Sequence, residues 1–311
     1  MPLLKSSMKP LLCILYTILL STSTVSGNRR HDSTRIVPII PRGGATDDNA
    51  VTNFTFPLFQ EGDGHEDDPD SIPGRFIRMQ KGNRAKATAS LEATLSWRSE
   101  KQVDTILGRP HTKYDLCKSV FPHCFLGRDP TDHVIFCQRP GFVDLNLAQE
   151  KNVTNEDLLM HYVCVLEYCW NILEPRPDQT MINILDLKGV SFGKTREMLA
   201  FVKEFVSMMS SHYPQRSYKT LIINAPHWFG TLFKMISPLL RESTRLKIKI
   251  SSPGKKQQRV LEECLGSALP EELTSGEPLA DSHTLPMEQE LREFVSLVLC
   301  VCMYMCLYLN L

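Results

Sequence analysis

The chain has 311 residues, enough for one large domain or two domains of ordinary size. Hydrophobic residues make up 42% of it and charged residues 23%, as in an average globular protein. Lysine plus arginine and aspartate plus glutamate both number 35, so the formal net charge is zero. A neutral chain lacks the general attraction to phosphate that nucleic-acid-binding proteins show, and we expect no nucleic-acid partner.

The layout of residues 1–27 is typical of a secretory signal peptide. Two lysines precede the apolar run 11–20, and small residues follow it. The run is shorter than the roughly 20 residues that a spanning helix needs. An uncleaved signal anchor is the alternative, because four arginines between residues 29 and 42 outnumber the lysines upstream and positive charge tends to stay cytosolic. Both interpretations predict a protein associated with membranes of the secretory or endomembrane pathway, but they place the following domain on opposite sides of the membrane.

The next two segments differ in composition. Residues 28–73 are rich in glycine, aspartate and proline and lack periodicity, which predicts a disordered linker. A small helical lobe is expected over 74–110, where Leu91 and Leu95 lie four residues apart on one helical face and Trp97 follows near the helix end. The folded part of the chain is therefore expected to begin near residue 74.

Strands and helices alternate over residues 111–276. A short strand is expected at 134–138, and Thr154 with Asp157 has the spacing of a capping box that opens a helix. From residue 181 the apolar runs are nearly continuous, which suits strands covered on both faces, and segments of helical period separate them. The expected elements are strands at 181–187, 219–223 and 245–250 and helices at 193–212, 227–240 and 257–267. This order predicts an α/β fold whose strands are mostly parallel and joined by right-handed crossovers.

The helix expected after residue 226 is apolar around most of its circumference. The strand before it stops at Asn224-Ala225-Pro226, at the carboxyl edge of the sheet where open parallel sheets form crevices, and Pro226 suits a first helical turn. One side of the helix can pack on the sheet, and the rest predicts contact with a membrane or a long apolar ligand. Burial by the terminal segments is the alternative. We expect a hinged lid, whose apolar residues are Trp228, Phe229, Leu232, Phe233, Ile236 and Leu240.

No catalytic constellation is recognisable in the sequence. It contains neither a glycine-rich phosphate loop nor a G-x-S-x-G nucleophile elbow, and we expect Asp186 to form a turn. The six cysteines outside the terminal apolar runs contain no C-x-x-C pair, which argues against zinc and predicts free, buried thiols. We expect no enzyme activity, no metal site and no cofactor.

The C-terminal end is apolar again. Residues 277–293 predict a second linker, and 294–309 predict an apolar membrane segment because the run has no polar face, although it is at the short end for a span. An apolar helix packed on the domain is the alternative. A lipid-anchor signal also fits, with small Ala280 and Ser282 before a polar spacer and the apolar tail.

Several ordered motifs resemble one family. YPQRSYKTLIINAPHWFGTLFKMISPLLRESTRLKIKI (213–250) looks like the core of the CRAL-TRIO lipid-binding domain, found in fungal phosphatidylinositol transfer proteins, tocopherol transfer protein and cellular retinaldehyde-binding protein. RFIRMQKGNRAKATASLEATLSWR (75–98) is similar to the small helical N-terminal lobe of that family. GRDPTDHVIFCQRPGFVDLN (127–146) is similar to its Gly-Arg-Asp segment and first strand, and LPEEL (269–273) lies where the family closes. The likeness covers about 200 residues, 75–276.

The resemblance implies a CRAL-TRIO fold, in which a mixed, mostly parallel sheet forms the floor of an apolar cavity. The helix after Asn-Ala-Pro would close this cavity as a gating helix. One lipid would lie inside, since an acyl chain gains roughly 0.8 kcal/mol for each methylene removed from water. Exchange of that lipid at a membrane would be limited by opening of the gate.

The resemblance also implies a cluster that binds the lipid headgroup. The residues that match it by motif position are Lys81, Gln215, Arg216, Thr244 and Lys247. Lysine and threonine suit a phosphate, because they supply charge and hydroxyl donors. Two positions depart from the pattern: Gln80 replaces an arginine, and Gln215 replaces the glutamate associated with the inositol ring. The interpretation is a phospholipid ligand such as phosphatidylinositol, with phosphoinositides and membrane phospholipids as partners.

Three alternatives stay open at this point. Lys247 and Lys249 fit a solvated strand face as well as a headgroup site. The ligand fits a sterol, a tocopherol or a retinoid as well as a phospholipid. The fold also suits an adaptor that recruits the chain to membranes or holds a protein partner without transferring lipid.

Overall fold

The computed structural model describes residues 55–59, 64–176, 178–191, 198–236, 245–266, 269, 273 and 284–309. Three predictions fall outside these residues in whole or in part. The signal segment 1–27 lies entirely outside them, as do the headgroup candidate Thr244 and the lid residue Leu240.

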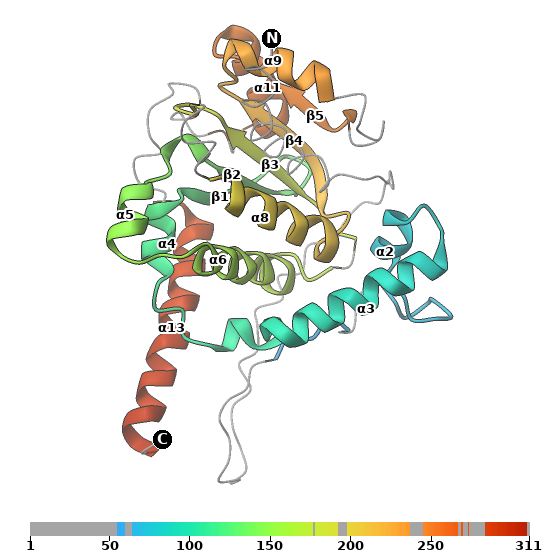
Figure 1. The fold of residues 1–311 in the computed structure, drawn as a ribbon, viewed down its shortest axis with the longest axis vertical. Coiled ribbons are helices and arrows are strands. Elements are labelled where there is room, and N and C mark those ends of the chain that lie inside the picture. Colours follow the sequence, from blue (N-terminus) through green and yellow to red (C-terminus); the bar gives the residue numbers. More distant parts are fainter. Residues whose placement is uncertain are drawn as a thin grey trace.

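A five-stranded sheet in the order β1-β2-β3-β4-β5 forms the centre of the molecule (Figure 1). Its strands are β1 (His123–Arg128), β2 (Val134–Gln138), β3 (Met181–Asp186), β4 (Ser217–Ile223) and β5 (Ile248–Ile250). The pair β1–β2 is antiparallel, and the other three pairs are parallel. The predicted mixed, mostly parallel sheet is therefore confirmed. Strand β1 was not predicted, because a bulge at Gly127 interrupts its period of two.

The helices surround this sheet. They are α2 (Gly74–Met79), α3 (Arg84–Lys101), α4 (Tyr114–Val120), α5 (Leu145–Glu150), α6 (Asn155–Tyr168), α8 (Leu199–His212), α9 (His227–Ile236), α11 (Lys255–Leu265) and α13 (Pro286–Leu309). Single turns of 3-10 helix lie at Val103–Gly108 and Pro140–Phe142, and a π-turn, Cys169–Leu173, extends α6. The capping box at Thr154 is confirmed, because its hydroxyl accepts from the Asp157 N–H at 3.1 Å and Asp157 accepts from the Thr154 N–H at 2.8 Å.

Both faces of the sheet are covered, as expected for apolar strands with parallel neighbours. On one face, Phe136 packs in a cluster with Tyr162 of α6 and Phe201 of α8. On the other face, Ile184 packs in a cluster with Leu261 of α11. Alternate residues of the strands thus face opposite sides of the sheet, which fixes the strand register, and Ile222 of β4 packs in a third cluster with Phe229.

The segment before α2 is ordered, and the prediction of a disordered linker is wrong for its described part. Leu58 and Ile72 are buried against Phe76 of α2 and Leu91 of α3. Arg84 of α3 also pairs with the carboxylates of two aspartates in this segment, Asp68 and Asp70. The Arg84 guanidinium lowers the pKa of Asp68 to about 2. The segment is acidic and rich in proline, so its composition concealed these tertiary contacts.

Helix α13 begins at Pro286, so the prediction of a linker over 277–293 is wrong from residue 286 onward. Its first turns pack on the domain: Leu291 is fully buried, and the Phe294 ring lies 5.2 Å from that of Tyr168. Glu288 is also fully buried, where it pairs with Lys118 and accepts from the N–H of Phe125 in β1 at 2.8 Å. The alternative of a packed helix therefore holds for the first turns of α13.

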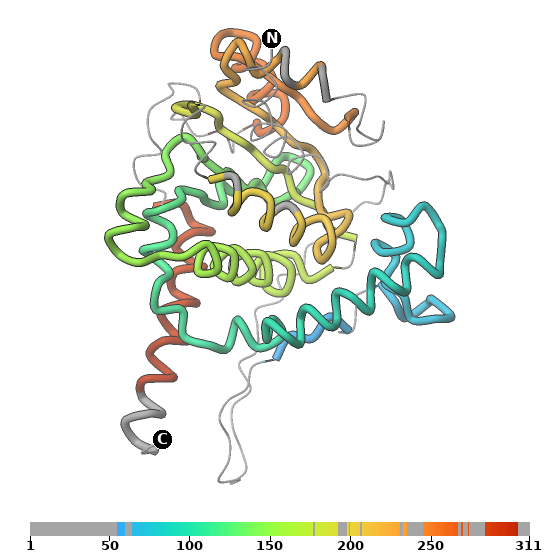
Figure 2. Tube along the Cα trace, in the orientation of Figure 1, coloured from blue at the N-terminus to red at the C-terminus, as the bar shows by residue number. Residues whose placement is uncertain are grey.

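The second half of α13 leaves the domain. Figure 2 shows the helix running along the body and then away from it. Leu297, Val301 and Met303 are exposed there. Among the described residues, no helix combines the length and apolarity needed to cross a membrane.

Candidate functional site

A buried hydrogen-bond network holds the turn between β4 and α9. Asn224 has a left-handed backbone (φ 51°), a conformation that asparagine tolerates better than most residues. Its side-chain N–H donates to Asp186 at 2.7 Å. Its backbone N–H donates to Gln257 of α11 at 2.7 Å, and the Gln257 amide donates back to the Asn224 side chain at 2.9 Å. The predicted hinge is thus tied to the end of β3 and to α11.

Asp186, the last residue of β3, is the shared acceptor of this network. Its carboxylate accepts from Asn224, from the Lys188 N–H at 3.0 Å and from the Arg139 guanidinium at 2.9 Å. Asp186 and Arg139 are both buried, and Arg139 also stacks on the Phe142 ring at 4.1 Å. The predicted turn-forming role of Asp186 is confirmed by the bond to Lys188. The bond to Arg139 was not predictable, because 47 positions separate the two residues.

Helix α9 lies on the sheet at the end of β4. Phe229 is buried with Leu185 and Ile222. Trp228 and Phe233 are half-buried at the edge of this cluster, and the side chains of Leu232 and Ile236 lie outside the described ones. Phe229 therefore packs α9, the helix predicted to be a lid, on Leu185 and Ile222. The apolar cavity predicted beneath it stays a prediction, because 237–240 fall outside the described residues.

Three of the headgroup candidates, Gln215, Arg216 and Lys247, lie near the beginning of β4. Gln215 is buried with a left-handed backbone (φ 64°). The next residue, Arg216, is buried with its guanidinium 4.3 Å from the Trp170 ring, and it donates to the Gln179 carbonyl at 3.2 Å. The Lys247 ammonium lies beside the residue that follows Arg216, because it donates to the Ser217 carbonyl at 2.9 Å. Burial lowers the pKa of Lys247, as expected for a cation partly removed from water.

Lys81 does not join this cluster through any contact among the described residues. It is exposed, and its backbone is left-handed (φ 53°) in the turn between α2 and α3. The sequence analysis also missed a polar row beside Lys247. Asn183 donates to the Ser217 hydroxyl at 3.2 Å, and that hydroxyl lies 3.3 Å from the hydroxyl of Thr220. The sequence did hold a signal for this polar row, because Asn183 is a polar residue within the otherwise apolar run of β3.

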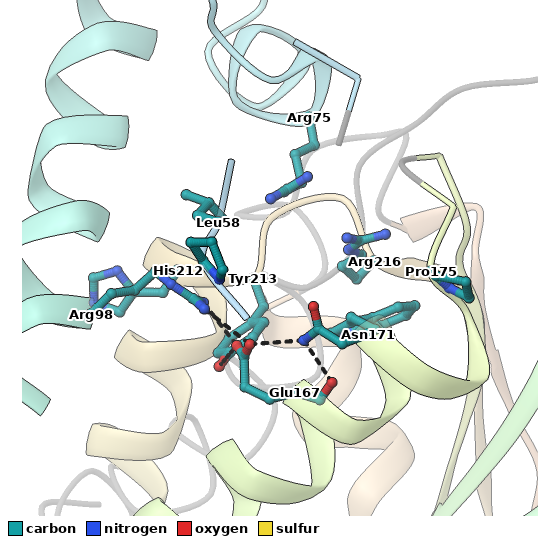
Figure 3. A pocket seen from close by; sticks show the side chains of 11 residues that line it. Leu58, Arg75, Arg98, Glu167, Asn171, Pro175, His212, Tyr213 and Arg216 are labelled. Carbon is teal, nitrogen blue, oxygen red and sulfur yellow. Dashed lines mark hydrogen bonds and ion pairs between the residues drawn. The ribbon is translucent and has the colours of Figure 1, made fainter. Parts of the chain in front are cut away.

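A small polar pocket of about 80 Å³ lies between the helical lobe and the sheet domain. Figure 3 shows Arg75 of α2 and Arg216 reaching it from different sides, with Glu167 of α6 at its base. Glu167 accepts two bonds from Arg98 of α3, at 2.8 and 3.0 Å, and one from the Tyr213 hydroxyl at 2.7 Å. Burial opposes the charge of Arg98, yet Glu167 raises the pKa of Arg98 above its usual value. The pocket therefore has two arginines, Arg75 and Arg216, at its rim, and at its base the charge of Glu167 is neutralised by Arg98.

The cysteines offer no activated nucleophile in the described part of the chain. The six outside the terminal runs are free and buried, as predicted: Cys117, Cys124, Cys137, Cys164, Cys169 and Cys264. Burial raises the pKa of Cys124 and of Cys164 to about 12, so these thiols stay protonated near neutral pH. The described histidines, cysteines and acidic residues form no cluster of three or more that could hold a metal ion.

Comparison with known proteins decides the family. Residues 119–274 match the family model described as the CRAL/TRIO domain. The chain belongs to the CRAL-TRIO family. The match contains all five strands, the hinge and α9, whereas the helical lobe and α13 lie outside it.

Several curated proteins are similar to this CRAL-TRIO protein. The SEC14 cytosolic factor of Eremothecium gossypii is 30% identical over 190 residues, covering 58% of this chain and 61% of that protein. That of Candida glabrata is 30% identical over 191 residues, covering 58% and 62%. Patellin-4 of Arabidopsis thaliana is 25% identical over 205 residues, covering 65% and 37%. The chain thus spans about three-fifths of the length of these SEC14 relatives.

Among solved structures, the chain is similar to the crystal structure of Sfh5. The TM-score is 0.48 and the sequence identity 16%, over 72% of this chain and 84% of that one. Within the CRAL-TRIO domain of this chain, Gln215 and Arg216 immediately precede β4 and Lys247 donates to Ser217, the first residue of that strand, whereas Lys81 is exposed.

Proposed function

We propose that this CRAL-TRIO domain binds one phospholipid, such as phosphatidylinositol, beneath α9 and transfers or presents it at membranes. The observation that carries the proposal is the hinged lid. Asn224 and Pro226 end β4 at a turn held by polar side chains, and the apolar helix α9 follows, packed on the sheet through Phe229. Among the side chains of α9 that the structure describes, Phe229 is buried and Trp228 and Phe233 are half-buried, so the helix can leave the sheet without disrupting either large core.

The two ends of such a ligand would meet different surfaces. Acyl chains would contact the apolar face beneath α9, at roughly 0.8 kcal/mol for each methylene buried. A phosphate would lie near Arg216 and Lys247, where it would favour the charged form of the half-buried Lys247. Gln215 can hydrogen-bond a headgroup hydroxyl without adding charge. The match to the CRAL/TRIO family model supports a lipid ligand.

Lipid mass spectrometry on the purified full chain tests the ligand. We expect about one phospholipid per chain, enriched in an anionic species. In Lys247→Ala the anionic share should fall about tenfold, because a charge-assisted bond is lost. Lys249→Ala is the matched control: it removes the same charge two residues away, from a side chain whose contacts are Cys264 and Glu263.

The outcomes separate the alternatives. A bound sterol, tocopherol or retinoid would overturn the phospholipid assignment. A folded chain without lipid would favour the adaptor. An equal loss in Lys247→Ala and Lys249→Ala would show that overall charge, and not a headgroup site, selects the lipid.

Transfer of fluorescent phospholipid between vesicles tests the lid. We expect Phe233→Asp to slow transfer at least about tenfold, because a carboxylate in place of the half-buried ring must be desolvated when α9 closes or enters a membrane. Lys234→Asp places the same acid on the exposed neighbour in α9 and should slow transfer less. Normal transfer by Phe233→Asp would end the lid model.

A further inference from the structure

A second cavity, of about 520 Å³, lies on the other side of the hinge from the headgroup candidates. It is bounded by the turn after β3, the hinge and the first turns of α11. Gln215 and Arg216 lie just before the first residue of β4, and Lys247 donates to that residue, whereas Asn224, which lines this cavity, follows the last residue of the strand. A seven-residue strand separates the two places by roughly 20 Å, at about 3.3 Å per residue. The cavity is therefore a separate site.

The charge around this cavity has one sign. Lys188 and Lys255 line it, and its described lining contains no carboxylate. Within the described residues neither lysine forms an ion pair. Asp186 lies nearby, but it is buried and its oxygens accept from Arg139, Asn224 and the Lys188 N–H. Two cations thus face one cavity without a neutralising partner in the described structure.

The adjacent helix adds to this positive field. Two exposed cations, Lys256 and Arg259, follow Lys255 on α11, and its first turn contains no acidic residue. Positive side chains at the beginning of a helix oppose its dipole, which has its positive end there. Gly254 and Gly189 leave the backbone on both sides of the cavity bare, with left-handed φ values of 132° and 76°. An anion between the two lysines would relieve this repulsion.

The same cavity touches the residues that hold the hinge. Asn224 and Gln257 both line it, and their paired hydrogen bonds are the link between the hinge and α11. An anion that bridges Lys188 and Lys255 would fasten the turn after β3 to α11 across this link. The anion would consequently bind more tightly to one position of the hinge than to another. Such a difference in affinity is what coupling between this cavity and the site beneath α9 requires.

We infer that this cavity is a second ligand site, which binds a phosphate-bearing anion and thereby controls the hinge of α9. The volume exceeds that of a single phosphate and suits a phosphorylated headgroup or a small soluble phosphate ester. Lysine suits such ligands because its ammonium is a compact charge with three donors. Anion binding is inferred independently of the lipid proposed beneath α9, and only its effect on the hinge depends on that proposal.

Calorimetric titration of the full chain with sodium pyrophosphate tests the soluble form of the ligand. Flotation with phosphatidylcholine vesicles, with and without phosphatidylinositol 4-phosphate, tests the membrane form. We expect the double variant K188A/K255A to weaken binding at least about tenfold in the form that the wild type binds. K86A/K203A is the matched control, since it removes two exposed lysines of α3 and α8 and changes the net charge equally.

Each outcome decides the inference. Pyrophosphate binding lost only in K188A/K255A supports a soluble ligand, and vesicle binding lost only in that variant supports a phosphorylated lipid headgroup. Equal losses in both double variants, or no binding of either probe by the wild type, would overturn the site. The lipid content of K188A/K255A by mass spectrometry should equal that of the wild type, so this site and the lipid proposed beneath α9 can fail independently.

Discussion

Replacing Glu167 with glutamine should lower the free energy of unfolding by about 3–5 kcal/mol, the usual cost of leaving a buried charge without its partner. Glu167 and Arg98 are each about 4% exposed at the side chain, and Glu167 accepts two bonds from Arg98 and a third from Tyr213. The remaining carboxylate near Arg98 is Asp104, at 2.6 Å, and it is 40% exposed. Urea unfolding followed by circular dichroism measures the effect.

A matched control for this substitution exists on the same helix. Glu156 of α6 pairs with Lys101 of α3 at 2.9 Å, but both side chains are at least one-third exposed. We expect Glu156→Gln to cost less than about 1 kcal/mol, as exposed ion pairs do. If Glu167→Gln were equally mild, the buried pair would not be what fastens the helical lobe to the domain.

Acidification below pH 6.5 should destabilise the protein, with a slope that approaches about 1.4 kcal/mol per pH unit for each histidine that stays neutral when folded. His111, His161 and His123 form a hydrogen-bonded chain, with nitrogen–nitrogen distances of 2.9 and 3.1 Å. The chain ends where His123 Nδ1 lies 2.7 Å from the Phe121 carbonyl. A carbonyl only accepts, so His123 Nδ1 carries its proton, and every ring along the chain is then satisfied as a neutral imidazole.

Burial lowers the pKa of all three histidines. The neighbouring rings and Lys118 add to this effect at His161, while Asp157 and Asp115 oppose it at His111. Because the folded pKa lies below the unfolded value near 6.5, the unfolded chain binds more protons once the pH falls below 6.5. The stability is therefore complete above that pH and decreases below it. His161 and His123 are both buried. Together they should make the free energy of unfolding fall with a slope that approaches about 3 kcal/mol per pH unit.

Urea unfolding at several pH values between 5.5 and 7.5 measures this slope. His161→Leu should be less stable at neutral pH, because the two neighbouring rings lose a hydrogen-bond partner. Its stability should nevertheless depend less on pH than that of the wild type, by about 1.4 kcal/mol per pH unit. A wild-type stability that is flat over this range would contradict a neutral chain of histidines.

The elements that local patterns encode were predictable. The strands after residue 181 and the helices between them follow from apolar runs and helical period, and Thr154 with Asp157 marked the beginning of α6. Gln215, Arg216 and Lys247 were selected through the family resemblance, and their role as a headgroup site stays a prediction. Periodicity alone would not have selected them.

Contacts between distant residues were not predictable. The pair Arg98–Glu167 spans 69 positions, and Lys118–Glu288 spans 170. From the sequence alone, a glutamate that is buried in the fold cannot be told from an exposed glutamate of a linker. Its partner lies too far away along the chain to be recognised. The beginning of helix α13 shows the consequence: residues from 286 onward were predicted as a linker, because the partner of Glu288 lies far away in the sequence.

Glu288 also bears on where the folding unit of this protein ends. β1 is an outer strand of the sheet, and the Glu288 carboxylate accepts a hydrogen bond from the Phe125 N–H of that strand. A shortened chain that ends at residue 274, the limit of the family match, would keep every strand. It would also leave the ammonium of Lys118 without its buried counter-charge and bare the outer strand to pairing with a second molecule. The first turns of α13 therefore cover part of the outer strand, and a chain cut at residue 274 would expose it.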